Sequence, residues 1–140
     1  MRFAKRDEPL FIRRTASPKR LAGAGGNRYD PTEQLKTLHI NPFYKQSGRL
    51  TGKHVVVVDD CTKYGMSFGI ASALLEKAGA TDASGVALGK FGDKLTHFEI
   101  AVTGDLFKLL SSADYVINSK TNFNGAASQQ VQQDLLALIG

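Results

Sequence analysis

The sequence predicts a single α/β domain whose mostly parallel sheet is flanked by helices, and three consecutive segments carry this prediction. Residues 54–58 contain four consecutive valines and are followed by two acids, which is typical of a short, buried parallel strand. Residues 67–77 have one apolar helical face and end shortly before Gly79, a residue type that favours helix termination. Residues 83–88 form a second apolar run, so the order and the short links indicate a βαβ unit.

Weaker signals extend the alternation to both sides of this unit. Asp30, Pro31 and Glu33 have the spacing of a capped helix start, and we expect a short helix that ends near Leu38. The remaining expected elements are a strand at 10–12, a strand at 98–102, a short helix at 105–111 capped by Asp105, a strand at 115–117, and a helix that begins at Ser128 with Val131, Leu135 and Ile139 on one face.

Length and composition set the class of protein. At 140 residues and 42% hydrophobic content, the chain fits one domain with a single core. No apolar stretch approaches the roughly 18 residues that a membrane helix needs, so we expect no membrane association. The first residues lack the apolar run of a secretory signal, and Cys61 is the one cysteine, which excludes an internal disulfide. A reducing, cytoplasmic location is the simplest interpretation.

The positive charge is concentrated at the amino-terminal end. Residues 1–20 hold seven Lys or Arg and two acids, a net charge of +5, whereas the other 120 residues carry eleven of each sign. We therefore divide the chain into a basic arm, residues 1–26, and an α/β domain, residues 27–140. Such an arm could contact nucleic acid or an anionic substrate. We favour a solvated end, because no aromatic residues interleave with its charges as on a single-strand-binding surface.

The chemistry is concentrated where the valine strand ends. Asp59 and Asp60 follow the strand, and the carboxyl ends of strands are where open α/β sheets bind ligands. A loop containing Gly65 leads to a helix whose first amides have no partner within the helix and attract anions. Adjacent carboxylates would repel an anion unless they bind another part of the same ligand. A sugar phosphate meets both needs, with its phosphate on the loop and its hydroxyls on the acids.

Residues 55–67 resemble the signature of type I phosphoribosyltransferases, which has four apolar residues, two acids and a loop ending in Thr-Gly-x-Thr/Ser. The flanking residues 52–53 and 77–80 also fit the family. The upstream residues 13–41 loosely resemble its competence-protein-F-like branch. The resemblance implies a type I phosphoribosyltransferase-like α/β fold. It is strong over about residues 50–90 and does not extend to the carboxyl-terminal third.

The resemblance also implies a function. Members of the family bind phosphoribosyl pyrophosphate (PRPP) with Mg²⁺ and transfer its phosphoribosyl group to a nitrogen base, with release of pyrophosphate. Asp59 and Asp60 would be the catalytic acids that hold the ribose 2′- and 3′-hydroxyls. Family members are commonly dimers, so a homo-oligomer is expected. The phosphate would be bound by the loop, which comprises Thr62, Lys63, Tyr64, Gly65, Met66 and Ser67.

Three departures from the family pattern bear on catalysis. Tyr64 stands where the family often has Thr, which removes one hydroxyl from the phosphate loop. Lys63 stands where some members have an acid or Thr; a protonated lysine attracts phosphate but cannot act as a base. The family also carries an upstream loop that binds pyrophosphate, for which residues 23–26 are the one weak candidate.

Two alternatives stay open beside a PRPP-dependent transferase. The first is a non-catalytic relative that keeps the phosphoribosyl site for sensing or regulation. The second, ranked lower, is a receiver-like domain in which the paired acids bind Mg²⁺ beside a phosphorylated Asp105. Only 80 residues follow Asp60, which is short for that fold, and the turn at 65–67 has no role in it.

Overall fold

The computed structural model describes residues 8–13, 31–45, 48–124 and 133. Most of the basic arm, the glycine cluster at 23–26, Asp30 and the helix expected from Ser128 lie outside the described residues. The elements are β1 (Phe11–Arg13), α2 (Thr32–Leu35), β2 (Leu38–Ile40), the 3₁₀ turn η1 (Pro42–Tyr44), β3 (His54–Thr62), α3 (Met66–Lys77), β4 (Asp82–Lys90), β5 (Lys94–Val102) and β6 (Tyr115–Asn124).

The described strands pair in three two-stranded ladders. β3 and β4 are parallel, whereas β1 with β2 and β5 with β6 are antiparallel. The mixed α/β class is therefore confirmed, but one ladder of three is parallel, where a mostly parallel sheet was expected. The short link at 91–93 between β4 and β5 explains part of this difference. A parallel return needs a crossover of about a dozen residues or more, so β5 has to run back.

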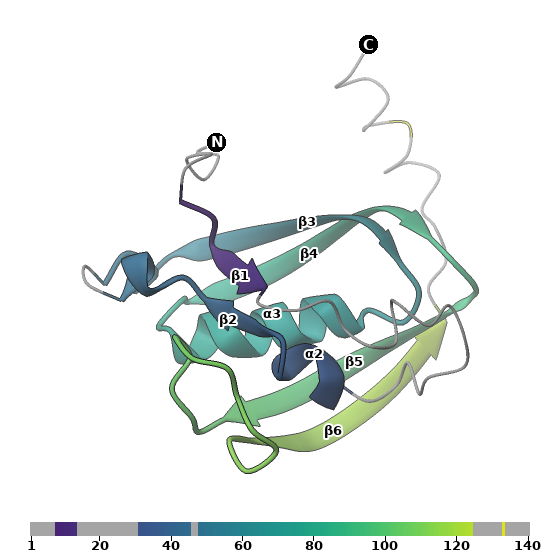
Figure 1. The fold of residues 1–140 in the computed structure, drawn as a ribbon. Helices are drawn as coiled ribbons and strands as arrows, with labels where there is room; N and C mark the ends of the chain where they lie inside the picture. Colours follow the sequence, from purple (N-terminus) through teal and green to yellow (C-terminus); the bar gives the residue numbers. More distant parts are fainter. Residues whose placement is uncertain (1–7, 14–30, 46–47, 125–132, 134–140) are drawn as a thin grey trace.

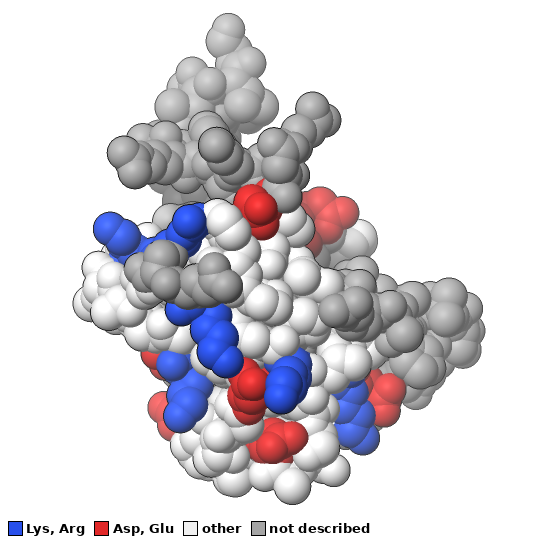
Figure 2. Space-filling view, turned by 60° about the vertical axis from the view of Figure 1, so that its left-hand side comes forward, with Lys and Arg blue, Asp and Glu red and all other residues white. Residues whose placement is uncertain are grey.

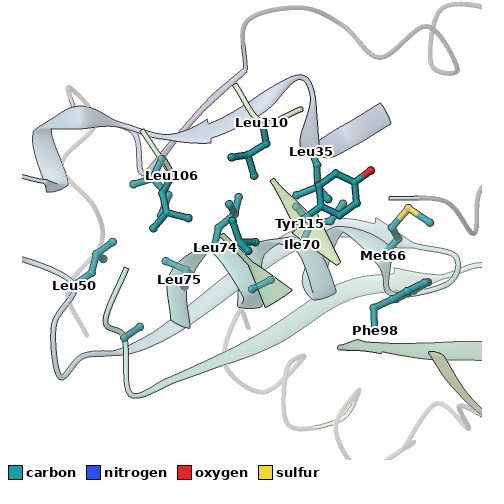
Figure 3. Packing of buried hydrophobic residues seen from close by; sticks show 14 residues of the cluster. Leu35, Leu50, Met66, Ile70, Leu74, Leu75, Phe98, Leu106, Leu110 and Tyr115 are labelled. Carbon is teal, nitrogen blue, oxygen red and sulfur yellow. The ribbon is translucent and has the colours of Figure 1, made fainter. Parts of the chain in front are cut away.

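α3 lies between the β3–β4 ladder and the β5–β6 ladder, with β1, β2 and α2 beside it (Figure 1). The side chains of Ile70, Leu74 and Leu75 are fully buried, so α3 is the centre of the core. Leu35 from α2 and Tyr115 from β6 pack in the same cluster (Figure 3). The unit formed by β3, α3 and β4 is thus held in place by contacts on more than one side of the helix.

Both ends of α3 follow the sequence prediction closely. The helix was expected over 67–77 and extends over Met66–Lys77. Gly79 has φ of +95°, and the amide of Ala80 donates to the carbonyl of Leu75 at 3.0 Å, which closes the last turn as expected from the glycine. The amide of Gly52 donates to the carbonyl of Gly79 at 2.9 Å. This bond connects the end of α3 to the chain that enters β3.

Two expected elements differ in the structure. The helix expected at 105–111 is absent; Asp105 instead accepts a hydrogen bond from the amide of Phe107 at 3.1 Å, as in a tight turn, and the carbonyl of Leu106 accepts from the amide of Ile40. The helix expected to end near Leu38 stops at Leu35, because Leu38–Ile40 pairs with β1. In both places contacts with β2 or β1 replace helical hydrogen bonds.

Candidate functional site

The candidate site is the junction between β3 and α3, where residues 63–65 connect the strand to the helix. Gly65 precedes the helix with φ of +79°, a left-handed conformation that side chains rarely adopt. A Cβ added at Gly65 would lie 3.2 Å from the carbonyl oxygen of Thr96. Glycine is therefore favoured here both by the backbone conformation and by the close approach of β5.

Three hydrogen bonds between described residues hold this loop. The amide of Gly65 donates to the hydroxyl of Thr62 at 3.0 Å, so the last residue of β3 fixes the turn. The amide of Thr96 in β5 donates to the carbonyl of Tyr64 at 3.0 Å, and the amide of Phe91 donates to the carbonyl of Thr62 at 2.9 Å. The loop is thus held by β3, by β5 and by the residue that follows β4.

The two acids point to opposite sides of β3. β3 continues to Thr62, so both acids lie inside a strand rather than after it, and successive side chains alternate between the faces. Asp59 shares a face with Val57, whose register partner Gly85 contacts Phe68 of α3. Asp60 is exposed and lies on the other face, called the outer face below. This outer face is defined by His54, Val56, Val58 and Asp60 of β3 and by Ser84, Val86 and Leu88 of β4.

Each acid also bonds the next residue of its own strand. Asp59 Oδ1 accepts from the amide of Asp60 at 3.0 Å, and Asp60 Oδ1 accepts from the amide of Cys61 at 2.8 Å. One oxygen of each carboxylate is thus engaged, and the other has no hydrogen-bond partner among the described residues, so it can accept from a ligand hydroxyl. Because Asp59 shares its face with α3 and the loop, Asp59 is the better placed of the two for a ligand held there.

The other expected loop residues differ in what they can offer a phosphate. The side chain of Met66 is buried in the core, so only its amide could reach a ligand. Ser67 is half-buried in the first turn of α3, where amides have no acceptor within the helix. Lys63 is exposed, with Nζ 5.2 Å from the centre of the Tyr64 ring. Thr62 is buried and bonds the loop, so its role is to hold Gly65 rather than to face a ligand.

One basic residue beside the loop was not expected from the sequence. Lys90 ends β4 and is the register partner of Thr62, and its ammonium group donates to the carbonyl of Gly92. Two lysines, Lys63 and Lys90, therefore belong to the segments at the carboxyl end of the ladder. The signal that could have identified Lys90 is its place at the end of the second strand of the βαβ unit, since parallel strands end at the same edge.

A cavity of about 250 Å³ begins at Gly65 and extends beside α3 between β4 and β5. Apolar side chains from Phe68, Leu95 and Phe98 line it, together with Ser72 of α3. Ser84 also borders it from β4, but its hydroxyl is bonded to His54 Nε2 on the outer face. Small residues leave room for the rings: a Cβ on Gly85 would lie 2.6 Å from the Phe68 ring, and one on Gly69 would lie 2.9 Å from Cβ of Phe98. The cavity is thus mainly apolar, and it adjoins the loop.

Figure 2 shows no large basic surface on the described residues that face the viewer. Basic and acidic side chains are interspersed there, in agreement with the balanced charge of residues beyond the arm. Among the described residues, no three His, Cys, Asp or Glu side chains lie together as a metal site would require. The described helices include none with the length and apolar character needed to cross a membrane.

Asp105 lies far from the paired acids. β5 contacts the loop through Thr96, and the strand then runs through Val102 before the turn that holds Asp105. Six further residues of antiparallel strand span about 20 Å. Asp105 is instead 3.7 Å from the ammonium group of Lys108. A receiver-like phosphoacceptor centre would need these acids together, and the structure separates them.

Comparisons with protein-family models, with curated proteins and with solved structures find no match to this chain.

Proposed function

We propose that this protein is a phosphoribosyltransferase-like protein that binds PRPP, or a nucleotide containing ribose 5-phosphate, at the junction of β3 and α3. The observation that carries the proposal is the three-residue connection from the acid-bearing strand to the helix, with Gly65 in the left-handed conformation. This connection puts a carboxylate and the amino end of a 12-residue helix at the same edge of the β3–β4 ladder. A sugar phosphate uses both groups at once, with its hydroxyls on the carboxylate and its phosphate on the helix end.

The phosphate is assigned to the amino end of α3. The amides of Met66 and Ser67 belong to the first turn, where they have no acceptor inside the helix, and the Ser67 hydroxyl can add a further donor. The helix dipole contributes about 0.3–2 kcal/mol to binding an anion there. Lys63 and Lys90 add positive charge at this edge, so the loop can compensate for a missing threonine hydroxyl at Tyr64.

The ribose is assigned to Asp59 first and to Asp60 second. Asp59 shares the face of α3, so its free oxygen can accept from a hydroxyl of a sugar whose phosphate is on the loop. Asp60 lies on the outer face and reaches the same sugar only from across the end of the strand. Together the two carboxylates add negative charge near the ribose, which favours the positive charge that develops on the ring during transfer.

Transfer would proceed by displacement at the anomeric carbon. A nitrogen atom of the acceptor base forms a bond to this carbon, while the bond from the carbon to pyrophosphate oxygen breaks and the electron pair leaves with pyrophosphate. Mg²⁺ bound to PRPP would neutralise the leaving group. The cavity beside Gly65 is the candidate space for a planar base, because its walls include Phe68 and Phe98.

A second candidate function is binding without transfer. The observation that favours it is the divergence of the acid pair, because Asp59 and Asp60 are on opposite faces of β3 and only Asp59 faces α3. Lys63 stands where some family members have an acid, and this substitution also favours binding without transfer. A sensor of phosphoribosyl compounds would keep the phosphate site and one ribose acid, without the geometry needed to release pyrophosphate.

Calorimetric titration of the full chain with PRPP and Mg²⁺, and separately with ribose 5-phosphate, tests the proposal. We expect both ligands to bind, and Asp59→Asn to weaken both by about ten- to a hundredfold, since one lost charge-assisted hydrogen bond is worth about 1.5–3 kcal/mol. Asp82→Asn is the matched control, because Asp82 begins β4 at the opposite end of the ladder. Tighter binding of PRPP than of ribose 5-phosphate would favour the transferase, and equal affinity would favour the sensor. Absence of binding by both ligands would refute the proposed function.

A further inference from the structure

The outer face of the β3–β4 ladder has a large exposed apolar area. Val56 is 56%, Val58 65% and Leu88 67% exposed, and Phe91, directly after β4, is 65% exposed. Parallel strands are normally covered on both faces, because the crossover connections place helices there. α3 covers one face of this ladder, so the other face is short of a covering element among the described residues.

The chain that follows β6 starts at the carboxyl end of this ladder. Asn124 ends β6 and is the register partner of Lys94, the first residue of β5. β4 ends at Lys90, so residues 91–93 are enough to pass from the level of β4 to the level of β5. Residues 125–127 are also three residues long, so the chain after Asn124 can span the same distance back to the end of β4. Residues 125–140 thus begin within reach of the end of β4 where Leu88 and Phe91 are exposed.

The sequence of this segment fits a covering helix. After Ser128, apolar residues recur at helical spacing at positions 131, 135, 138 and 139, and the opposite side carries glutamines. Twelve helical residues span about 18 Å, and a helix is about 10 Å wide. The two strands are about 4.8 Å apart, and the run from Leu88 to Ser84 is about 13 Å long. One such helix therefore matches the exposed area in both length and width.

We propose that residues 128–139 form an amphipathic helix that docks on the outer face of the β3–β4 ladder and covers Val56, Val58 and Leu88. A second copy of the chain is a poorer occupant. Two strands of nine residues offer a face of roughly 300 Å², well below the roughly 800 Å² per partner that stable complexes bury. Asp60 lies on the same face, so the docked helix would also stand next to the more exposed acid of the pair.

Cysteine cross-linking in the full chain tests this docking, with Cys61→Ser as the background. We expect Val58→Cys with Leu135→Cys to form an intramolecular disulfide on mild oxidation, seen as a monomer with altered mobility. Val58→Cys with Gln133→Cys is the matched control, because position 133 is on the opposite side of the helix, and it should stay reduced. Equal cross-linking in both pairs, no cross-linking in either, or disulfide-linked dimers would each overturn the proposal.

A second measurement does not depend on cysteine geometry. Leu135→Asp should release the helix and increase the fluorescence of a dye that binds exposed apolar surface, severalfold over the unchanged chain. Gln133→Asp adds the same charge on the polar side and should leave the fluorescence unchanged. Equal fluorescence of the unchanged chain and of both variants would contradict the docking. A Val56–Val58–Leu88 surface that the helix never covers would give the same dye signal in all three proteins.

Discussion

Replacing Gly65 by alanine tests how the loop between β3 and α3 is built. At φ of +79° the new side chain meets the ordinary penalty of the left-handed conformation, about 1–2 kcal/mol for an L residue. Its Cβ would also lie 3.2 Å from the carbonyl oxygen of Thr96, so the loop or β5 has to move. We expect Gly65→Ala to lower the free energy of unfolding by about 2 kcal/mol and to weaken phosphate binding by at least tenfold, which is about 1.4 kcal/mol.

Gly92→Ala provides the matched control for this experiment. Gly92 has φ of +71°, so alanine meets the same backbone penalty there, but no atom lies within 4 Å of the added Cβ. Urea unfolding should show a loss of about 1–2 kcal/mol for Gly92→Ala, while calorimetric titration with ribose 5-phosphate should show unchanged affinity. The reasoning fails if both variants weaken binding equally, or if Gly65→Ala binds as tightly as the unchanged chain.

Three further predictions concern the core, the loop and an acidic turn. Leu74→Ala, at a fully buried position, should cost about 2–5 kcal/mol in urea unfolding. Leu109→Ala, at a side chain that is 47% exposed, should stay within about 0.5 kcal/mol of the unchanged chain. Thr62→Val removes the acceptor of the Gly65 amide; it should lower stability by about 1–3 kcal/mol and weaken ribose 5-phosphate binding, so unchanged values would contradict the role of Thr62. Hydrogen bonds from the Ser111 hydroxyl and amide hold the pKa of Asp114 below its ordinary value, so this carboxylate contributes stability above its ordinary pKa that is lost as pH falls through the lowered pKa. NMR titration should show the pKa of Asp114 rising in Ser111→Ala, and an unchanged pKa would refute the assignment.

The βαβ unit was predictable because its signals are local. Four valines define a strand, and the apolar face of residues 67–77 defines a helix whose observed bounds, Met66–Lys77, differ by one residue. Gly79 ended the helix as its sequence position indicated. At each of these positions, the intrinsic propensity and the hydrophobic periodicity favour the same secondary structure, and the tertiary contacts agree with it.

The length of β3 could not be obtained in the same way. Aspartate is a poor strand former, so Asp59 and Asp60 seemed to mark the end of the strand. The structure continues β3 to Thr62, because residues as late as Lys90 of β4 pair with it. This extension is what places the two acids on opposite faces, a property of the site that depends on a pairing partner and not on the local sequence.

The remaining differences also arise from contacts between distant segments. The turn at Asp105 replaces an expected helix, where the carbonyl of Leu106 bonds β2 instead of continuing a helix. The contact of Thr96 with the loop joins residues more than thirty positions apart and has no local signal. Lys90 was missed as a possible phosphate ligand for the same reason, since its place beside Thr62 follows from the register of β3 and β4.

The most direct test of the central proposal is to map phosphate binding onto individual amides. In NMR spectra of the full chain titrated with ribose 5-phosphate, we predict saturable shifts of the amide signals of Gly65, Met66 and Ser67, with weaker changes at Asp59. The same titration with unphosphorylated ribose should leave the three loop signals in place. Shifts that are absent from the loop, or that concentrate on other parts of the described chain, would contradict a phosphate site between β3 and α3.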